Sequence, residues 1–316
     1  MAESFNTLAG LVQFNDKNLA DLNVTDLLED APVLQKLHAQ EASDKTIHYY
    51  LKQTTASTAA FRDALDAVAK TASADTKVTC TLKILDGSFD TDVALADAYK
   101  GGRDAWLQLE LVRKMKQVFA TAEKQVFYGT GADAKGFAGI LDGLITALSN
   151  AMCVNAAGST ASVQTSCYLL RSGRDDASFI MGNGGQIVVE DEPTVIAKAG
   201  AVLTSSTYPA LYVPVTGYAG FQYGGTYSIA RIANIDTNSL TSSTAFTDVH
   251  LMNALARFPG SRRPNMICMN RNAQLLLWNS RSAYSPTGAP AALPVDFMGI
   301  PFIITDQILS TEAVET

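Results

Sequence analysis

The sequence predicts an α+β fold, and three observations along the chain indicate it. Residues 103–128 carry apolar side chains at the 3.6-residue period of a long amphipathic helix. Residues 165–235 hold a succession of short apolar runs separated by glycine and polar turns, the pattern of a β-rich region. Two further runs of alternating polar and apolar residues, over 47–51 and 76–85, predict strands joined by a long excursion.

The composition excludes several classes of protein. The chain has 316 residues, of which 47% are hydrophobic, so it can bury a substantial core and is not a disordered chain. The net charge of −7 argues against a protein that holds nucleic acid through a basic face. Charged residues make up only 17%, below the roughly 25% usual for soluble domains. This deficit favours a subunit that buries large areas against copies of itself.

The first part of the chain has little with which to build a core. Residues 1–45 predict an arm more than a domain, because two short apolar patches are separated by Asn and Asp and the second contains Pro32. Between the strands predicted at 47–51 and 76–85, the Ala-rich segment 59–70 has few large apolar side chains. We therefore expect this excursion to need a partner surface.

The long helix is the clearest element of the sequence. Asp92 is placed to cap a short helix over 93–99, and Gly101-Gly102 separates that helix from the long one over 103–128. At about 1.5 Å per residue the long helix forms a rod of roughly 37 Å. A compact globule of this length has a radius of gyration of about 20 Å, so we expect an elongated or flat subunit. The apolar stripe consists of Leu111, Met115, Val118, Ala122 and Val126.

The remainder of the chain predicts mostly strands and turns. Thr247 or Asp248 can cap a helix that ends at Pro259-Gly260, and a second helix is expected over 271–281. No repeat of fixed period occurs, which argues against solenoids and propellers. Strands are expected over 167–170, 179–181, 186–189, 211–215, 227–235, 266–269 and 301–305.

Few residues are arranged for catalysis or metal binding. The three histidines lack the close spacing with Cys or His that zinc sites use, and neither G-x-S-x-G nor H-E-x-x-H occurs. Gly129-x-Gly131 is similar to a dinucleotide fingerprint but follows a helix instead of a strand, so it predicts a helix cap and turn. The acidic groups at 86–92 and 190–192 are interpreted as turns and caps. We expect no catalytic residue, no cofactor and no metal site.

The cellular setting follows from cysteine usage and from the N-terminus. Four cysteines scattered along the chain fit reduced, buried thiols better than a disulfide framework, which predicts a cytosolic origin. Residues 1–14 contain Glu3 and no basic n-region, and no apolar run approaches 18 residues. We therefore expect neither a signal peptide nor a membrane span.

Three passages of the chain carry distinctive motifs. The first is Glu123-Lys124-Gln125-Val126-Phe127-Tyr128-Gly129-Thr130-Gly131, followed by Gly136-Phe137-Ala138-Gly139-Ile140. The second is the strand at 227–235, and the third is the strand and helix at 266–281 with the closing strand at 297–306. In order and spacing they resemble the major capsid proteins of tailed bacteriophages, which have the Hong Kong 97-type fold. The residues that carry the resemblance are Glu123, Phe127, Gly129, Gly131, Phe137, Gly139, Arg231, Asn234, Asn270, Gly299 and Pro301.

The resemblance implies a division of the chain into five parts. An extended β-hairpin loop would lie on an adjacent subunit, and the spine helix at 103–128 would belong to a peripheral domain. The axial domain would contain the β-rich segment 165–235. The implied boundaries are 1–45 for the N-terminal arm, 46–82 for the extended loop, 83–139 for the peripheral domain, 140–290 for the axial domain, and 291–316 for a strand returning to the peripheral domain and the C-terminus.

The resemblance also implies a function and partners. A structural protein of this family assembles as hexamers and pentamers into an icosahedral shell that encloses double-stranded DNA, without sequence-specific binding and without a membrane. Such a protein is made in the bacterial host cytoplasm and resides in the virion capsid. A portal and a decoration protein are further expected partners. Because the arm is too short to contain a long internal scaffold, we also expect a separate scaffolding protein.

One family property is not expected, and three alternatives stay open. Some relatives cross-link a Lys of the extended loop to a late Asn. Lys52, Lys70 and Lys77 could serve as the first partner, but no Asn follows Asn279, so we predict no cross-link. The alternatives are an encapsulin-type compartment shell, a hydrolase with an unrecognised site, and a carbohydrate-binding or adhesive β-domain. The last would not explain the central helix.

Overall fold

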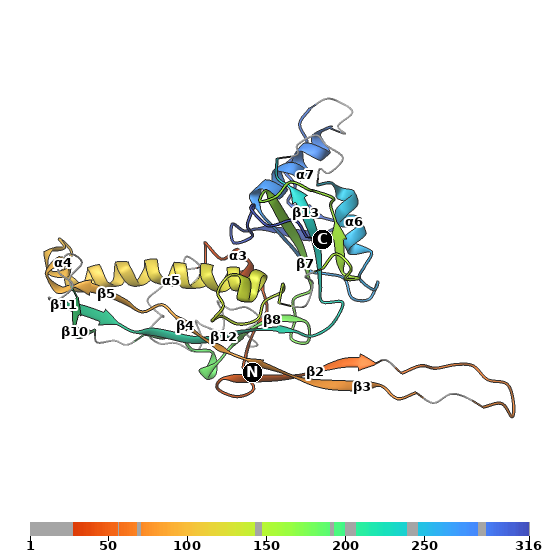
Figure 1. The fold of residues 1–316 in the computed structure, drawn as a ribbon, viewed down its shortest axis with the longest axis horizontal. Helices are drawn as coiled ribbons and strands as arrows, with labels where there is room; N and C mark the ends of the chain where they lie inside the picture. Colours follow the sequence, from red (N-terminus) through yellow and green to blue (C-terminus); the bar gives the residue numbers. More distant parts are fainter. Residues whose placement is uncertain are drawn as a thin grey trace.

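A long helix, a projecting hairpin and a compact lobe define the shape of the molecule. The computed structural model describes residues 28–55, 57–67, 71–142, 147–189, 193–199, 207–238, 246–283 and 289–315. In Figure 1 the helix α5 and the sheets beside it extend to one side, while the hairpin β2–β3 extends to the other. The lobe that carries the C-terminus stands at their junction. The subunit is elongated, as the length of the helix predicted.

The helix α5 covers Arg103–Tyr128, the range that its apolar stripe predicts. Its C-terminal half is the buried half, from Met115 to Phe127, whereas the residues of its first turns are half-buried or exposed. The short helix α4, Val93–Ala98, precedes it, and the Asp92 carboxylate caps α4 by accepting from the backbone N–H of Ala94 at 2.9 Å. The helix therefore crosses from the core to the exposed end of the subunit.

Two sheets accompany α5 and form with it what we call the elongated body. One has the order β1-β8-β12-β4, with β9 also paired to β12, and the other has the order β10-β11-β5. The predicted strand at 211–215 is divided by Pro214 between the two sheets. Their bounds are β1 Ala39–Glu41, β4 Lys83–Asp86, β5 Phe89–Asp92, β8 Ala177–Met181, β9 Val188–Val189, β10 Thr194–Ala199, β11 Thr207–Val213 and β12 Val215–Tyr223.

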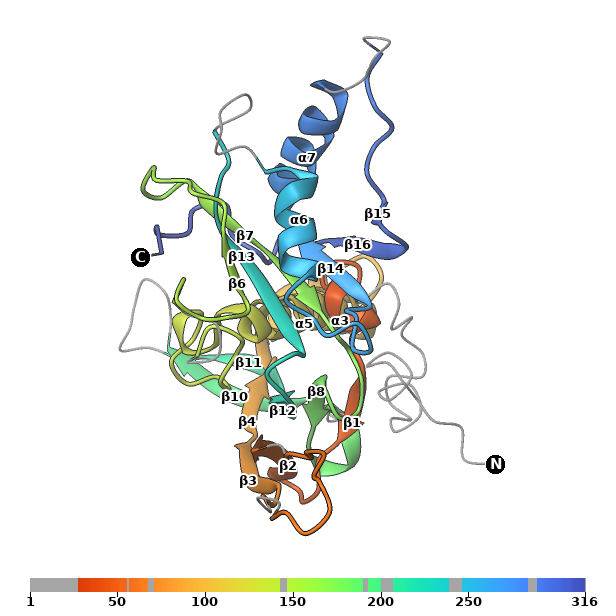
Figure 2. The ribbon, with the colours of Figure 1, turned by 90° about the vertical axis from the view of Figure 1, so that its right-hand side faces the viewer.

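The compact part is a six-stranded lobe with the strand order β15-β16-β14-β7-β13-β6. Figure 2 shows helices α6 and α7 beside this sheet. Every residue of β7, β13 and β14 is buried, including polar residues of β7 and β13 such as Gln164, Arg231 and Asn234. The bounds are β6 Cys153–Asn155, β7 Gln164–Leu170, β13 Ile229–Asp236, α6 Asp248–Leu255, β14 Met266–Met269, α7 Arg271–Ala283, β15 Asp296–Phe297 and β16 Ile300–Ile304.

The hairpin consists of β2, Ile47–Thr55, and β3, Ala74–Thr81. The single strand predicted over 76–85 is in fact two strands that belong to different sheets. The change of sheet occurs at Leu82, whose side chain is buried and whose N–H donates to the Thr46 carbonyl at 3.0 Å. An alternating pattern does not mark this point, because the alternation continues through it.

The described part of the predicted arm belongs to the core. A short helix α3, Pro32–Lys36, and the strand β1, which pairs in parallel with β8, occupy this region. Leu28, Leu34 and Leu37 are fully buried. Elements of five and three residues are too short to show a period, so the sequence indicates only apolar patches here. The first 27 residues of the predicted arm lie outside the described residues.

Strand pairing also divides the chain differently from the predicted partition. The range 140–290 contributes β7, β13 and β14 to the six-stranded lobe, but β8, β10, β11 and β12 to the elongated body. The closing strand β16, expected to return to the peripheral domain, pairs with β14 of the six-stranded lobe. These partners are far apart in sequence, so local patterns identify the strands without identifying their sheet.

Candidate assembly surfaces

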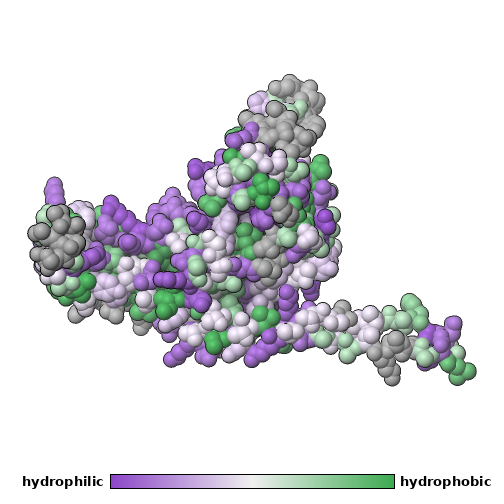
Figure 3. All heavy atoms as spheres, viewed as in Figure 1, coloured by the Kyte–Doolittle hydropathy of each residue, from purple (hydrophilic) through white to green (hydrophobic). Residues whose placement is uncertain are grey.

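The hairpin exposes apolar side chains that the rest of the described chain leaves uncovered. In β2 the Leu51 side chain is 71% exposed, and Phe61 and Leu65 in the loop beyond it are 107% and 104% exposed. Figure 3 shows green spheres beside purple ones at the right-hand tip of the hairpin. A two-stranded ribbon with no covering layer is marginal in water, so it needs contact with another surface.

The base of the hairpin is fixed to the elongated body by polar contacts. The buried His48 lies with Nε2 2.8 Å from Gln222 Oε1 of β12, and its Nδ1 is 3.1 Å from the Ser43 hydroxyl. The Lys52 ammonium lies 4.9 Å from the centre of the Tyr223 ring, a cation–π geometry. The ribbon is therefore oriented at its base and unsupported at its tip.

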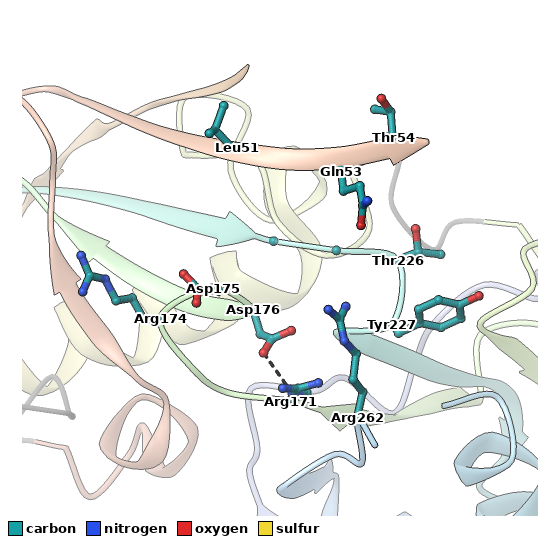
Figure 4. A pocket seen from close by; sticks show the side chains of 12 residues that line it. Leu51, Gln53, Thr54, Arg171, Arg174, Asp175, Asp176, Thr226, Tyr227 and Arg262 are labelled. Carbon is teal, nitrogen blue, oxygen red and sulfur yellow. Dashed lines mark ion pairs between the residues drawn. The ribbon is translucent and has the colours of Figure 1, made fainter. Parts of the chain in front are cut away.

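A polar cleft of about 650 Å³ separates the hairpin from the six-stranded lobe. Figure 4 shows Leu51, Gln53 and Thr54 of β2 on one side of it and three arginines on the other. Arg171 forms an ion pair with Asp176 at 3.0 Å. The residues that line the cleft are Leu51, Gln53, Thr54, Arg171, Arg174, Asp175, Asp176, Gly224, Gly225, Thr226, Tyr227 and Arg262. No nucleophile with an adjacent base is among them, so the cleft provides charged contacts and no catalytic set.

Glu123, the first signature residue, connects three segments of the chain. Its Oε2 accepts from the backbone N–H groups of Val33 and Leu34 at 2.8 and 3.1 Å, and the Thr305 hydroxyl donates to its Oε1. The carboxyl group thus caps helix α3, which has no side-chain cap of its own. Burial raises the pKa of Glu123 to about 7.

The turn after α5 explains two of the signature glycines. Gly129 has φ +53°, and a Cβ there would lie 2.4 Å from the backbone N of Gly139. A Cβ on Gly139 would lie 2.4 Å from the Gln125 carbonyl oxygen. The two backbone segments therefore pass too close for any side chain. Gly131, by contrast, has no atom within 4 Å of its Cβ position, and the structure gives no steric reason for a glycine there.

The two signature phenylalanines pack on strands of different sheets. The Phe127 ring lies 5.0 Å from the Tyr168 ring of β7, measured between centroids. Phe137 meets Phe179 of β8 edge to face at 5.9 Å. The passage from α5 into the glycine turn therefore joins the helix to both the six-stranded lobe and the elongated body.

Arg231 lies at the centre of a buried charge cluster that holds the C-terminal segment. Its guanidinium donates to Ser166 Oγ at 3.0 Å, to Glu315 Oε1 at 2.9 Å and to Glu312 Oε2 at 3.2 Å. Glu312 also accepts from the Tyr128 hydroxyl at the end of α5. Burial, followed by the charge of Glu312, raises the pKa of Tyr128 well above its ordinary value.

Asn234 extends this cluster along β13. Its φ is +58°, in the left-handed region that Asn tolerates better than most residues. Its side-chain oxygen accepts from the Glu315 N–H at 2.8 Å, and its amide donates to the Glu315 carbonyl at 3.0 Å. Sequence reasoning did not identify Glu312 and Glu315. The one clue in the sequence is that a buried Arg needs carboxylate partners. No local pattern identifies which carboxylates pair with Arg231.

The last three signature residues lie at the other edge of the six-stranded sheet. Asn270 donates to the Ile308 carbonyl and accepts from the Asn272 N–H at 2.9 Å, at the start of α7. Gly299 has φ +80° in the two-residue turn between β15 and β16. Pro301 is exposed in β16, opposite Asp296. Most signature residues therefore form separate internal contacts, Gly131 and Pro301 do not, and the set does not meet at one site.

Within the described part of the chain, no group of three or more His, Cys, Asp and Glu side chains is placed to hold a metal ion. None of the helices in that part combines the length and the apolarity that crossing a bilayer requires. The structure does contain contacts that connect distant segments of the chain, and a hairpin whose apolar tip is exposed. This combination defines the class of structural proteins that assemble through repeated contacts between subunits.

The chain belongs to the family of the major capsid protein GP7, whose model matches residues 16–315. It is therefore a tailed-phage major capsid protein with a Hong Kong 97-type fold, a structural component of the virion capsid and not an enzyme. This identification confirms the resemblance drawn from the three motifs. The hydrolase and carbohydrate-binding alternatives are wrong, and the family favours the phage capsid over the encapsulin shell.

One of the solved structures similar to this chain supports the fold. A chain of bacteriophage Epsilon15 is 18% identical, with a TM-score of 0.61 over 88% of this chain and 87% of that one. The capsid of bacteriophage JBD30 is 8% identical, with a TM-score of 0.49 over 92% and 94% of the two chains. An encapsulin from Synechococcus elongatus has 10% identity and a TM-score of 0.43 over 66% and 89%. A search of curated proteins found no match.

Proposed function

We propose that this capsid protein assembles as hexamers and pentamers into an icosahedral shell around double-stranded DNA, with the hairpin of each copy lying on an adjacent copy. The observation that carries the proposal is the fully exposed apolar loop at Phe61 and Leu65. In a shell, the same contact repeats at every subunit, so weak individual contacts sum to a stable lattice while misplaced subunits can still dissociate.

Electron microscopy of the purified protein tests this proposal. We expect closed particles hundreds of Å across, with six-fold and five-fold capsomers in averaged images. Nucleic-acid content of particles purified from infected cells distinguishes a genome container from a compartment for enzymes. A discrete small oligomer at concentrations of about 1 mg/ml and above, with the hairpin folded onto its own subunit, would contradict the proposal.

The five-part division of the chain is part of the proposal, with two refinements from strand pairing, one of which is that β16 pairs within the six-stranded lobe. The range 46–82 serves as the extended loop, and α5 at 103–128 serves as the spine of the peripheral domain. Strands β8 to β12, although inside 140–290, act with the peripheral domain, because they pair beside α5. The signature residues act as joints between these parts. Glu123 joins the start of the described chain to β16, and Arg231 joins β13 to the C-terminal segment.

A separate scaffolding protein, a portal and a decoration protein are the partners we propose. The support for these partners is membership of the tailed-phage capsid family, whose resemblance implies them. Co-expression provides the test. Particles of uniform size are expected only when the chain is produced together with a scaffolding protein of the same phage in the bacterial cytoplasm. Uniform shells from this chain alone would contradict the proposal.

We propose that the subunits are not covalently joined. Lys52 and Lys77 of the hairpin lie over the rings of Tyr223 and Tyr49 of their own subunit, at 4.9 and 3.8 Å from the ring centres. Lys70 lies outside the described residues. Residues 280–316 contain no Asn that could serve as the second partner. Particles boiled in detergent should give only monomer bands, and a ladder of covalent oligomers would overturn this expectation.

The DNA is proposed to be enclosed more than bound. The chain carries 31 acidic and 24 basic residues, so its total charge does not attract a polyanion. Release of DNA from opened particles should therefore need no high salt. Retention of DNA on disrupted shells, reversed only by raising the salt concentration, would argue for a basic inner wall instead.

A further inference from the structure

The cleft between the hairpin and the six-stranded lobe carries more positive charge than its own residues neutralise. Three arginines and two aspartates line it, which leaves one positive charge in excess. Arg171 forms an ion pair with Asp176 at 3.0 Å, and the other Asp176 oxygen accepts from the Ser228 hydroxyl at 2.9 Å. Both carboxylate oxygens of Asp176 are therefore already engaged within the chain.

Two guanidinium groups of this cleft lack acceptors. Arg171 Nη1 is buried and has no hydrogen-bond partner among the described residues. The Arg262 guanidinium forms neither an ion pair nor a hydrogen bond with any of them. Figure 4 shows both side chains on the lobe side of the cleft. A buried N–H of a charged group costs free energy when it has no acceptor, and an oxyanion bound there would recover that cost.

Neutral donors lie around the same space. Gln53 of β2 points from the hairpin into the cleft, toward Arg262 (Figure 4). Thr226, in the turn between β12 and β13, lies at its side. Neither of these two side chains has a hydrogen-bond partner among the described residues. Arginine, amide and hydroxyl groups are the side-chain donors with which proteins hold phosphate oxygens.

Hydrogen bonds within the chain hold the walls of the cleft in place. Gln222 of β12 donates to the Arg174 carbonyl at 2.8 Å, and its oxygen lies 2.8 Å from His48 Nε2 at the base of the hairpin. The Gly224 N–H donates to the Asp176 carbonyl at 3.1 Å, so the two turns beside the cleft are joined. Preformed walls lower the cost of ordering the site when a ligand binds.

We propose that this cleft binds the phosphate group of a small molecule, with the Arg171 and Arg262 guanidinium groups and the Gln53 amide as donors. Asp175 and Asp176 line the same cleft and would repel a long polyanion, whereas a single phosphate group can bind beside the arginines. The volume of about 650 Å³ exceeds that of one phosphate group, so the body of a phosphorylated molecule also has room. All the donors belong to one chain, so the site does not depend on the proposed shell.

A bound phosphate joins the hairpin to the lobe. Gln53 belongs to β2, whereas Arg262 lies between α6 and β14 of the lobe. The contacts of β2 with the rest of the subunit, such as that of His48 with Gln222, lie at the base of the hairpin. A ligand held from both sides adds a second attachment farther along β2. The backbone amides of residues 51–54 should therefore exchange with deuterium more slowly when phosphate is bound.

Equilibrium dialysis of the full chain against radiolabelled inorganic phosphate, at low salt, is the direct test. We expect saturable binding of one phosphate ion per chain. Arg262→Gln should weaken binding about tenfold or more, because a charged donor is lost. The matched control is Arg263→Gln, the next residue, which is exposed and does not line the cleft. It should change the affinity by less than about twofold.

Hydrogen exchange measured by mass spectrometry provides an independent readout. Phosphate should slow exchange in residues 51–54 of the wild type and of Arg263→Gln, but not of Arg262→Gln. Absence of saturable binding, or equal weakening by Arg262→Gln and Arg263→Gln, would overturn the site. Neither measurement requires particles, so failure of this inference leaves the proposed function untouched, and failure to form particles leaves the site untouched.

Competition against the bound phosphate identifies the source of the group. Displacement by adenosine triphosphate at a lower concentration than by unlabelled phosphate would assign the site to a phosphorylated small molecule, and the reverse order would assign it to the free ion. A short oligonucleotide or a polyglutamate peptide that displaces phosphate at lower concentration than both would overturn the assignment to a small molecule.

Discussion

The six-stranded lobe and the hairpin differ in where their stabilising contacts come from. In the lobe, every residue of β13 is buried and the Arg231 charge is met by carboxylates of the same chain. In the hairpin, the tip residues Phe61 and Leu65 meet only solvent. The comparison teaches that the stabilising contacts of the lobe lie within the monomer, whereas the apolar tip of the hairpin has no such contacts there.

The largest loss in the free energy of unfolding is expected from removing the Arg231 charge at the centre of the lobe. Arg231→Met leaves Glu312 and Glu315 without their partner and should lower the free energy of unfolding by about 3–5 kcal/mol. Urea unfolding of the full-length subunit, below the concentration at which it assembles, measures this loss. Adding Glu312→Gln should recover part of it. A loss under about 1 kcal/mol would mean that the lobe does not depend on its charge cluster.

The stability that Glu123 contributes by joining the start of the described chain to the lobe should depend on pH. The folded-state pKa of Glu123 is about 7 and lies above its ordinary value of 4.5, so protonation favours the folded state. Its contribution is greatest below pH 4.5 and is lost as the pH rises to 7, by about 3 kcal/mol in all. Above pH 7 the contribution stays at its low level.

Glu123→Gln isolates this contribution. The amide has the shape of the protonated acid, and its oxygen can accept from Val33 and Leu34 while its NH₂ donates to Thr305. The variant should match the wild type near pH 4.5 and become increasingly more stable than it up to pH 7. Unfolding curves across this range give the difference. Parallel pH profiles would show that Glu123 does not carry the dependence.

A smaller loss is expected where α5 turns back toward the lobe. Gly139→Ala places a Cβ 2.4 Å from the Gln125 carbonyl and should cost about 1–3 kcal/mol. Gly131→Ala is the matched control, because its Cβ meets nothing within 4 Å, and it should change stability by less than about 0.5 kcal/mol. Thermal unfolding of the two variants side by side measures the contrast. Equal effects would contradict the assignment of the close approach to Gly139.

Local patterns predicted the elements of both regions, but not their connections. The 3.6-residue stripe indicates α5, and short runs rich in apolar residues indicate β13 and β14, because each signal lies within the element itself. The pairing of Arg231 with Glu312 joins residues 81 positions apart, and nothing local marks it. Gly131 and Gly139 are equivalent in the motif, yet only the latter is required by a backbone contact. That difference depends on how the chain returns in space.

The smallest effect on the subunit, and the sharpest test of the comparison, is expected at the hairpin tip. Phe61→Ser with Leu65→Ser removes no contact within the monomer, so the free energy of unfolding should change by less than about 0.5 kcal/mol. Particle formation, followed by sedimentation, should fall sharply, because the contact between copies loses its apolar anchors.

Leu65→Gly separates the two roles of this position. Glycine relieves the strain at φ +71°, so the variant subunit should be as stable as the wild type or up to about 1 kcal/mol more stable, while its assembly is impaired. Val249→Ser, on the exposed face of α6, controls for the loss of a surface apolar group and should assemble normally. If the tip variants unfold more easily in the monomer, the hairpin has contacts within its own subunit. Its lack of cover would then not be what drives the lattice.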